Sequence, residues 1–334
     1  MKAVGFTQSL PIQDPQSFFN FKAEKPEPGP HELLIKIKAV SVNPVDYKVR
    51  QSAAKQKELE EPKIIGWDAC GIVEKVGEGV SHFIAGDKLF YAGDLTKPGC
   101  YAEYQVVDER IAAKSPENQS WEEIAAIPLT GLTAWECIFD RMKIEEGDGE
   151  GKTILIIGGA GGVGSIAIQL LKALTNFKVV ATASRDETTA WCKKMGADKV
   201  IGHNALAKEL ENNSIDYILN FADTSGYWQT MANLIKPQGG ICAIVNTTEP
   251  VDINLLKNKS VSFHWELMFT RSRYQTADME AQHKILASIA WLMENNKIKS
   301  TLHKKFEGLE AETFKKVHEL QESGKSIGKN VIVY

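Results

Sequence analysis

Five glycines lie between residues 158 and 164, in the segment GGAGGVG, at a spacing suited to phosphate binding. An apolar run rich in β-branched residues, 153–157, precedes them, and apolar residues at helical spacing follow. In this context Gly159 permits a tight turn, Gly161 lets backbone N–H groups approach a pyrophosphate, and Gly164 permits close helix–strand packing. A helix N-terminus adds partial positive charge. We therefore predict dinucleotide binding rather than a merely flexible turn. The predicted contacts are Gly159, Gly161, Gly162, Val163 and Gly164.

The residues that end the next predicted strand, 178–182, indicate which dinucleotide binds. NAD-binding proteins place Asp or Glu there, about 20 residues beyond the glycines, to bind the ribose 2′-hydroxyl. Ser184 and Arg185 occupy that place here, and a guanidinium can hold a 2′-phosphate through two parallel hydrogen bonds. In the alternative, Asp186 is the acid that binds NAD, but Asp186 is better explained by the first turn of the following helix. NADPH is therefore the predicted cofactor.

The elements around this segment predict an α/β fold. Residues 1 to about 125 read as short strands separated by glycine and proline turns, with alternating polarity over 32–41. From Lys152 onward, strands and helices alternate, which predicts a parallel sheet covered by helices. The later predicted elements are strands at 178–182, 199–201, 217–220, 241–245, 261–263 and 330–333, and helices at 187–195, 226–235, 278–294 and 310–322.

Composition excludes several classes of protein. The chain has 334 residues, 43% hydrophobic and 25% charged, with a net charge of −4, so no electrostatic footprint for nucleic acid is present. No apolar run is long enough to span a membrane, and the first residues lack a signal-peptide core. Five dispersed cysteines without a C-x-x-C pair disfavour a disulfide framework or a four-cysteine zinc lobe. A cytoplasmic protein is expected.

Several phrases resemble a known family, the quinone oxidoreductase branch of the medium-chain dehydrogenase/reductase superfamily, and within it the zinc-type alcohol dehydrogenase-like proteins. These phrases are AVSVNPVDYKVR (39–50), IIGWDACGIVEKVGEGV (64–80), GDKLFY (86–91), PLTGLTAWE (128–136), TASRDETTAWCKKMGAD (182–198) and SIGKNVIVY (326–334). The resemblance implies a GroES-like β-rich catalytic domain over 1–126 and a Rossmann doubly wound nucleotide-binding domain over 127–268. It also implies a C-terminal segment, 269–334, that returns to the catalytic domain.

The zinc ligands of the superfamily do not match this sequence. Zinc-dependent members bind the catalytic ion through a cysteine and through a histidine in a G-H-E phrase. Asn43 and Trp67 stand at those places, and only Asp68 keeps an acidic character. An amide and an indole cannot replace a thiolate and an imidazole as zinc ligands. We therefore expect a zinc-free member.

Site residues follow from the same resemblance. Asn43 is expected to face the nicotinamide and the substrate, and Lys48, in the N-P-V-D-x-K phrase of enone reductases, to bind the substrate carbonyl or the enolate. Tyr47 is a second candidate proton donor. A solvated lysine paired with Asp46 explains Lys48 equally well. These candidates are expected on a loop, 43–50.

Further residues are assigned by resemblance to the cofactor and the substrate. Thr133, Val245 and Phe269 are expected near the nicotinamide, although Thr133 also suits a helix-start hydroxyl. His203 is either a phosphate contact or a surface residue. Lys329 and Asn330 either reach the cofactor's phosphates or form an ordinary surface turn. Aromatic residues that could wall a pocket for a flat conjugated substrate, or else belong to the core, are Trp67, Tyr91, Trp265 and Phe269.

The combined interpretation is an NADPH-dependent, zinc-independent reductase of quinones or α,β-unsaturated carbonyls. The alternatives are a zinc-type alcohol dehydrogenase and a weakly catalytic NADPH-binding redox sensor, because fold alone does not establish catalysis. By resemblance the protein is expected to be a homodimer, joined through the strand near 261–263 at the edge of the nucleotide-domain sheet.

Overall fold

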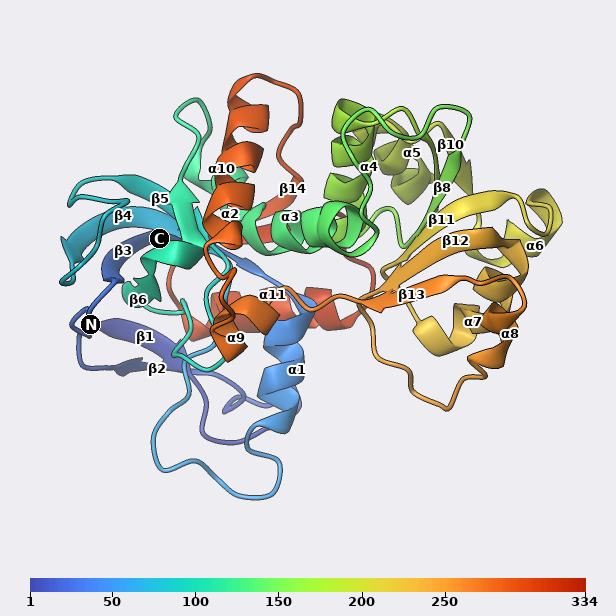
Figure 1. The fold of residues 1–334 in the computed structure, drawn as a ribbon. Helices are drawn as coiled ribbons and strands as arrows, with labels where there is room; N and C mark the ends of the chain where they lie inside the picture. Colours follow the sequence, from blue (N-terminus) through green and yellow to red (C-terminus); the bar gives the residue numbers. More distant parts are fainter. The chain divides into compact units, whose positions relative to one another are not determined.

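A computed structural model describes residues 1–334 and divides the chain into two compact units (Figure 1). The first unit comprises Met1–Leu129 and Phe269–Tyr334, and the second comprises Thr130–Met268. The sequence-based division instead ends its first domain at residue 126. No helix has the length and apolar character needed to cross a bilayer.

The first unit contains a seven-stranded sheet in the order β14-β15-β3-β4-β5-β7, with β6 paired to β3. Its pairs are antiparallel except β14 with β15. A separate antiparallel pair joins β1 to β2. The β-rich first domain is confirmed. The strands are β1 (Lys2–Gly5), β2 (Phe19–Lys22), β3 (Glu32–Val42), β4 (Ala69–Val76), β5 (Lys88–Tyr91), β6 (Tyr104–Asp108), β7 (Ala112–Lys114), β14 (Leu302–Glu307) and β15 (Lys329–Val333).

The segment that follows β3 is a helix, α1 (Pro44–Ser52), and the expectation of a loop over 43–50 is wrong. Asn43 is its N-cap, Pro44 stands at the first helical position, and Asp46 at the third accepts the backbone N–H of Asn43 at 2.8 Å. These are helix-start features. The other helices of this unit are η1 (Glu109–Ile111), α2 (Trp121–Ala125), α9 (Thr270–Tyr274), α10 (Ala281–Glu294) and α11 (Ala311–Glu322).

The second unit is built on a six-stranded sheet in the order β10-β9-β8-β11-β12-β13, and every pair in it is parallel. The predicted doubly wound parallel sheet of the Rossmann type is confirmed. The strands are β8 (Thr153–Ile157), β9 (Lys178–Thr182), β10 (Lys199–Ile201), β11 (Ile215–Asn220), β12 (Ile235–Ala243) and β13 (Ser262–Trp265). The helices are α4 (Gly162–Leu174), α5 (Asp186–Met195), η3 (His203–Ala205), α6 (Leu206–Glu209), α7 (Thr224–Leu234) and α8 (Asn254–Lys257).

Helix α3 (Pro128–Trp135) carries the chain from the first unit into the second and continues as a π-helical stretch, η2 (Glu136–Arg141).

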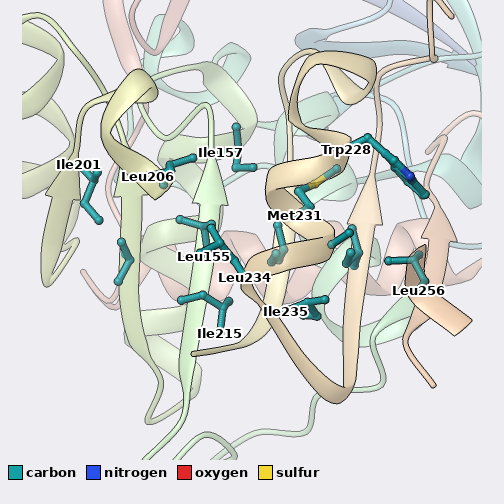
Figure 2. Packing of buried hydrophobic residues seen from close by; sticks show 14 residues of the cluster. Leu155, Ile157, Ile201, Leu206, Ile215, Trp228, Met231, Leu234, Ile235 and Leu256 are labelled. Carbon is teal, nitrogen blue, oxygen red and sulfur yellow. The ribbon is translucent and has the colours of Figure 1, made fainter. Parts of the chain in front are cut away.

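Strand β8 is buried on both faces, as its composition predicts. Leu155 and Ile157 join one apolar cluster with Trp228 and Met231 of α7 (Figure 2). Ile154 and Ile156, which alternate with them, are also fully buried. Burial of each such side chain contributes about 1.5–3 kcal/mol. The glycine turn at the end of β8 is therefore anchored by a rigid central strand.

Candidate active site

The glycine turn between β8 and α4 has the geometry that phosphate binding requires, with one change in the predicted roles. Gly158, not Gly159, has the left-handed conformation of the turn, with φ of 88°. A Cβ at Gly159 would lie 2.7 Å from Cβ of Ala181, and one at Gly164 would lie 2.3 Å from the carbonyl oxygen of Gly158. Gly159 therefore packs against β9, whereas Gly164 permits the close helix–strand contact that we predict for it.

The start of α4 is open to an anion. Gly161 is exposed, and a Cβ there would meet only the Gly158 oxygen, at 3.5 Å. As the N-cap, Gly161 has no side chain to accept from the first N–H groups, and the first turn contains no acidic residue. Gly162 and Val163, which begin the helix, are partly exposed. These N–H groups and the positive end of a 13-residue helix fit a pyrophosphate.

Beyond the ends of β9 and β10, hydrogen bonds join Ser184, His203 and Tyr227, and Arg185 follows Ser184 in the chain. Ser184 and Arg185 are exposed, and Ser184 Oγ accepts the backbone N–H of His203 at 3.0 Å. A 3.0 Å hydrogen bond joins Nδ1 of His203 to the hydroxyl of Tyr227 on α7. Burial lowers the pKa of His203 and raises that of Tyr227. Asp186 is the first residue of α5, which confirms its predicted place in the first turn.

Two residues expected near the nicotinamide lie in the second unit. Thr133 is buried in the second half of α3, so the helix-start explanation of its hydroxyl is wrong. Val245 follows the carboxyl end of β12 and is half-buried, and its carbonyl accepts from the Thr224 hydroxyl at 2.6 Å. Ligands of open α/β sheets bind beyond this edge.

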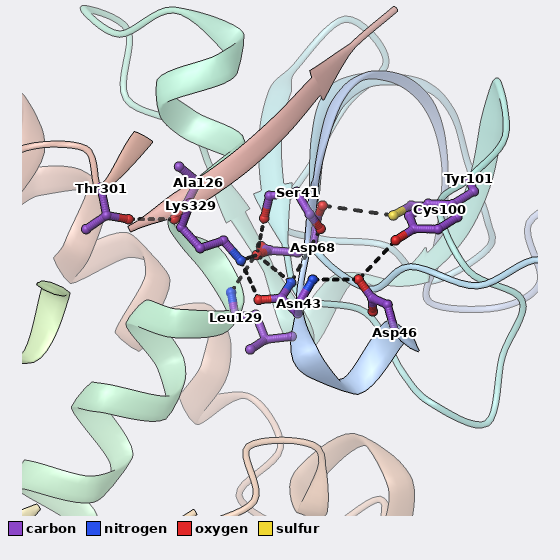
Figure 3. A network of polar contacts seen from close by, with 10 residues as sticks. All are labelled: Ser41, Asn43, Asp46, Asp68, Cys100, Tyr101, Ala126, Leu129, Thr301 and Lys329. Carbon is purple, nitrogen blue, oxygen red and sulfur yellow. Dashed lines mark hydrogen bonds and ion pairs between the residues drawn. The ribbon is translucent and has the colours of Figure 1, made fainter. Parts of the chain in front are cut away.

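In the first unit, Asn43 is joined to a buried polar group that we call the Asn43 cluster: Ser41, Asn43, Asp68 and Lys329 (Figure 3). Asp68 Oδ2 accepts from Ser41 Oγ at 2.6 Å, Asn43 Nδ2 at 3.0 Å and Lys329 Nζ at 3.0 Å. Lys329 also donates to Asn43 Oδ1. The other Asp68 oxygen accepts the backbone N–H of Leu129 at 3.1 Å. Every member is less than 4% exposed.

A second buried chain of hydrogen bonds continues from the start of α1. The hydroxyl of Tyr101 lies 3.1 Å from Asp46 Oδ2 and 3.0 Å from His318 Nε2. Burial is the largest influence on both outer groups. It raises the pKa of Asp46 to about 7 and lowers that of His318 to about 3. His318 is therefore neutral near pH 7, and Asp46 titrates there.

The two candidate proton donors on α1 differ in exposure. Lys48 is exposed, and its ammonium makes no hydrogen bond or ion pair with the protein. Asp46 faces the interior instead, so the explanation of Lys48 as its ion-pair partner is wrong. Tyr47 is half-buried, and burial raises its phenol pKa.

The predicted pocket aromatics are mostly interior. Trp67 and Tyr91 are fully buried. Trp67 packs edge-on against Phe269 with ring centroids 6.5 Å apart, and Tyr91 donates to Gln105 at 2.7 Å. Neither ring is placed as an open pocket wall. Trp265, in the second unit, is 49% exposed.

The two C-terminal residues expected at the cofactor's phosphates are also interior. Lys329 points its ammonium into the Asn43 cluster. Asn330 is 1% exposed and donates to Ser326 Oγ at 3.1 Å. In this structure neither side chain forms part of a surface turn, so the alternative of an ordinary surface turn is wrong for both.

Sequence reasoning did not identify Ser41, Tyr101, His318 or Tyr227 as members of these networks. Ser41 carries a signal, because it is a polar residue at an inward-facing position of an otherwise apolar strand end. The other three meet their partners across 24 to 217 residues, and no local pattern reveals such contacts.

Comparisons with known proteins place this geometry in a family. Residues 29–117 match the model of the alcohol dehydrogenase GroES-like domain, and residues 195–332 match that of the zinc-binding dehydrogenase. A zinc-type alcohol dehydrogenase-like protein of Staphylococcus epidermidis is 42% identical over 99% of both chains.

Two solved structures are similar over the whole chain. A Rhizobium etli protein, provisionally described as a zinc-dependent alcohol dehydrogenase, is 42% identical with a TM-score of 0.93, covering 100% of this chain and 98% of that one. The quinone oxidoreductase of Coxiella burnetii is 27% identical with a TM-score of 0.81, covering 100% and 99%. The chain therefore belongs to the medium-chain dehydrogenase/reductase superfamily, a superfamily of oxidoreductases, as its sequence motifs predict.

Proposed function

We propose that the protein is an NADPH-dependent, zinc-independent reductase of quinones or α,β-unsaturated carbonyls. The observation that carries the proposal is the open glycine turn together with the residues that follow β9. Ser184 and Arg185 stand where an NAD-binding protein has a carboxylate, and both are exposed. His203 is hydrogen-bonded to Ser184, and Tyr227 to His203. A 2′-phosphate is the group that a guanidinium and hydroxyls recognise.

The Asn43 cluster supports zinc independence, although the family descriptions mention zinc. Asn43 offers an amide whose oxygen already accepts from Lys329, and Trp67 offers an indole. Asp68, the acidic residue that follows Trp67, has both oxygens in hydrogen bonds. The ammonium 3.0 Å from this carboxylate would repel a dication. These residues do not fit a catalytic zinc ion.

The proposed substrate class follows from two points. These residues do not suit a zinc ion that could polarise a carbonyl, and relatives in the family include a quinone oxidoreductase. A conjugated carbonyl accepts hydride at carbon and spreads the resulting charge onto oxygen, where hydrogen-bond donors suffice to stabilise it. Quinones share this electronic character, and the Coxiella burnetii relative is described as a quinone oxidoreductase. NADPH supplies the hydride when it is bound.

The residues of this chain would then bind the cofactor and supply the proton in the following way. The N–H groups at the start of α4 hold the pyrophosphate, and Arg185 with Ser184 holds the 2′-phosphate. Thr133, Val245 and Phe269 are proposed to lie along the nicotinamide. After hydride transfer, the proton comes from Lys48, Tyr47 or water.

The test is NADPH oxidation with a panel of a benzoquinone, an enal, an enone and a saturated ketone. We expect turnover with the conjugated compounds and none with the saturated ketone. Zinc-dependent oxidation of alcohols would favour the zinc-type alcohol dehydrogenase. Tight NADPH binding without turnover of any compound would favour the redox sensor.

We also propose a homodimer joined through β13. This strand lies at the end of the six-stranded sheet, with one edge unpaired, and it ends in the 49% exposed Trp265. An exposed edge with large apolar side chains invites pairing with a second strand. A two-fold axis would place β13 of each protomer against the other.

A further inference from the structure

Lys329 carries the positive charge of the Asn43 cluster, in surroundings that are unusual for a lysine. It is 3% exposed, whereas lysine is almost never buried unless it is paired. Its ammonium donates to Asn43 Oδ1 and to Asp68 Oδ2. An ammonium has three N–H donors, so the hydrogen bonds to Asn43 and Asp68 leave one N–H spare.

The amide of Asn43 has no such spare donor. Its Nδ2 donates to Asp68 at 3.0 Å and to the backbone carbonyl of Ser41 at 3.4 Å, while its oxygen accepts from Lys329. Both ends of the amide are therefore engaged inside the protein. Asn43 serves to position the ammonium of Lys329, and it cannot itself donate to a substrate without breaking one of these bonds.

Asp68 holds the buried ammonium of Lys329 but accepts only one of its three N–H groups. Its carboxylate balances the charge of Lys329 and is held by the Ser41 hydroxyl and the backbone N–H of Leu129. Water is nearly excluded from the cluster, so a remaining N–H of the ammonium would interact more strongly with an anionic oxygen than it would in water. Lys48, in contrast, is exposed, and its charge is screened by solvent.

We propose that Lys329, held by Asn43 and Asp68, is the catalytic residue that binds the oxygen of the conjugated carbonyl and stabilises the enolate. This inference rests on the proposed function. It assigns to Lys329 a task different from the phosphate contact expected from the sequence. Its ammonium contacts Asn43, which stands where zinc-dependent members have a cysteine ligand, and Asp68, which follows the position of their histidine ligand.

The reaction balances with NADPH and one proton. The hydride carries two electrons to the β-carbon, and the electron pair of the C=C bond moves toward the carbonyl, which leaves negative charge on the oxygen. Lys329 donates its remaining N–H to that oxygen and keeps its proton. A proton from water, Lys48 or Tyr47 then adds to the α-carbon, and the products are the saturated carbonyl and NADP⁺. The hydrogen bond strengthens as charge develops, so it lowers the barrier more than it tightens substrate binding.

The experiment compares the parent protein with Lys329→Met, using kcat for an enone, the NADPH dissociation constant from fluorescence titration, and thermal melting. We expect kcat to fall about 10²- to 10³-fold, the loss typical of removing one such donor. NADPH affinity should change little. Lys304→Met is the matched control, because Lys304 is an exposed lysine on β14, paired in register with Asn330, and it should keep the parental kcat.

Lys329→Met leaves the Asp68 carboxylate buried without its cation, so this variant can fail to fold. The double variant Lys329→Met/Asp68→Asn removes both charges and should show the same loss of kcat in a folded protein. Parental kcat in either folded variant would overturn the inference. Unchanged kcat with NADPH affinity weakened more than about tenfold would instead support the phosphate contact. Failure of the parent protein to oxidise NADPH with any conjugated carbonyl would refute the proposed function itself.

Discussion

Asp46 is predicted to make the protein less stable as pH rises from about 4 to about 7. The carboxyl group is fully buried, its Oδ2 accepts from Asn43 and lies within hydrogen-bond distance of Tyr101, and its Oδ1 has no hydrogen-bond partner. Burial raises its pKa from 3.8 to about 7, against the opposing effects of the Asn43 hydrogen bond and of Lys329. The folded protein therefore binds this proton more tightly than the unfolded chain does.

The sign and size of the effect follow from linkage. Below about pH 3.8 the group is protonated in both states and contributes no difference. Between that pH and about 7 only the unfolded chain loses the proton, so the free energy of unfolding falls as pH rises. Each pKa unit corresponds to about 1.36 kcal/mol, so the pKa values of 3.8 and about 7 give a penalty of about 4 kcal/mol above neutrality.

The assay is urea unfolding of the parent and of Asp46→Asn at about pH 4 and about pH 8, which bracket the two pKa values. The asparagine keeps an acceptor for the Asn43 N–H but cannot titrate. We expect the difference in unfolding free energy to move by about 4 kcal/mol in favour of the variant between the two pH values. Glu61→Gln, at an exposed residue without an ion pair, is the control and should show no such change. Parallel stability profiles for the parent and Asp46→Asn would refute the reasoning.

Three further predictions address the cofactor, the metal and the assembly. Arg185→Ala should weaken NADPH by about 1.5–3 kcal/mol and NADH much less, because only NADPH offers a 2′-phosphate. Equal affinity of the parent for both cofactors, measured by titration, would contradict that assignment. Elemental analysis should find no stoichiometric zinc. One zinc per chain, together with loss of activity on adding a chelator, would show that the interpretation of Asn43 and Trp67 as unable to bind zinc is wrong. Light scattering should give twice the 37.0 kDa chain mass at micromolar concentration, and a persistent monomer would exclude pairing through β13.

Local sequence patterns are sufficient to predict the central strand, the glycine turn and the helix that follows. The β-branched run of β8, the glycines after it and the apolar spacing of α4 all depend on residues close together in the chain. The capping box of Ser120 and Glu123 at the start of α2 is equally local. Helix α1 has a comparable local signal in Asn43, Pro44 and Asp46, which favours a helix rather than the expected loop.

Local sequence is a weaker guide where a segment's structure depends on pairing with another strand. Strand β14 (LHKKFE) has little apolar alternation, and it forms because β15 offers it a parallel partner. The same holds for the end of α7 at Leu234, where Ile235 already belongs to the sheet through its pairing with Ile215. Hydrogen bonds to a distant strand outweigh the weak local preference in both cases.

The sequence by itself determined the family and the parallel-sheet unit, and it places Ser184 and Arg185 after β9, where we propose that a 2′-phosphate binds. Only the tertiary structure decided what those residues touch. Lys329 is 286 positions from Asn43, yet its ammonium donates to that amide, because β15 pairs with the end of β3. Tyr227, on α7, is likewise hydrogen-bonded to His203, in η3, although 24 positions separate them. A charge buried beside a carboxylate exists only once the chain has folded, and spacing along the sequence carries no record of it.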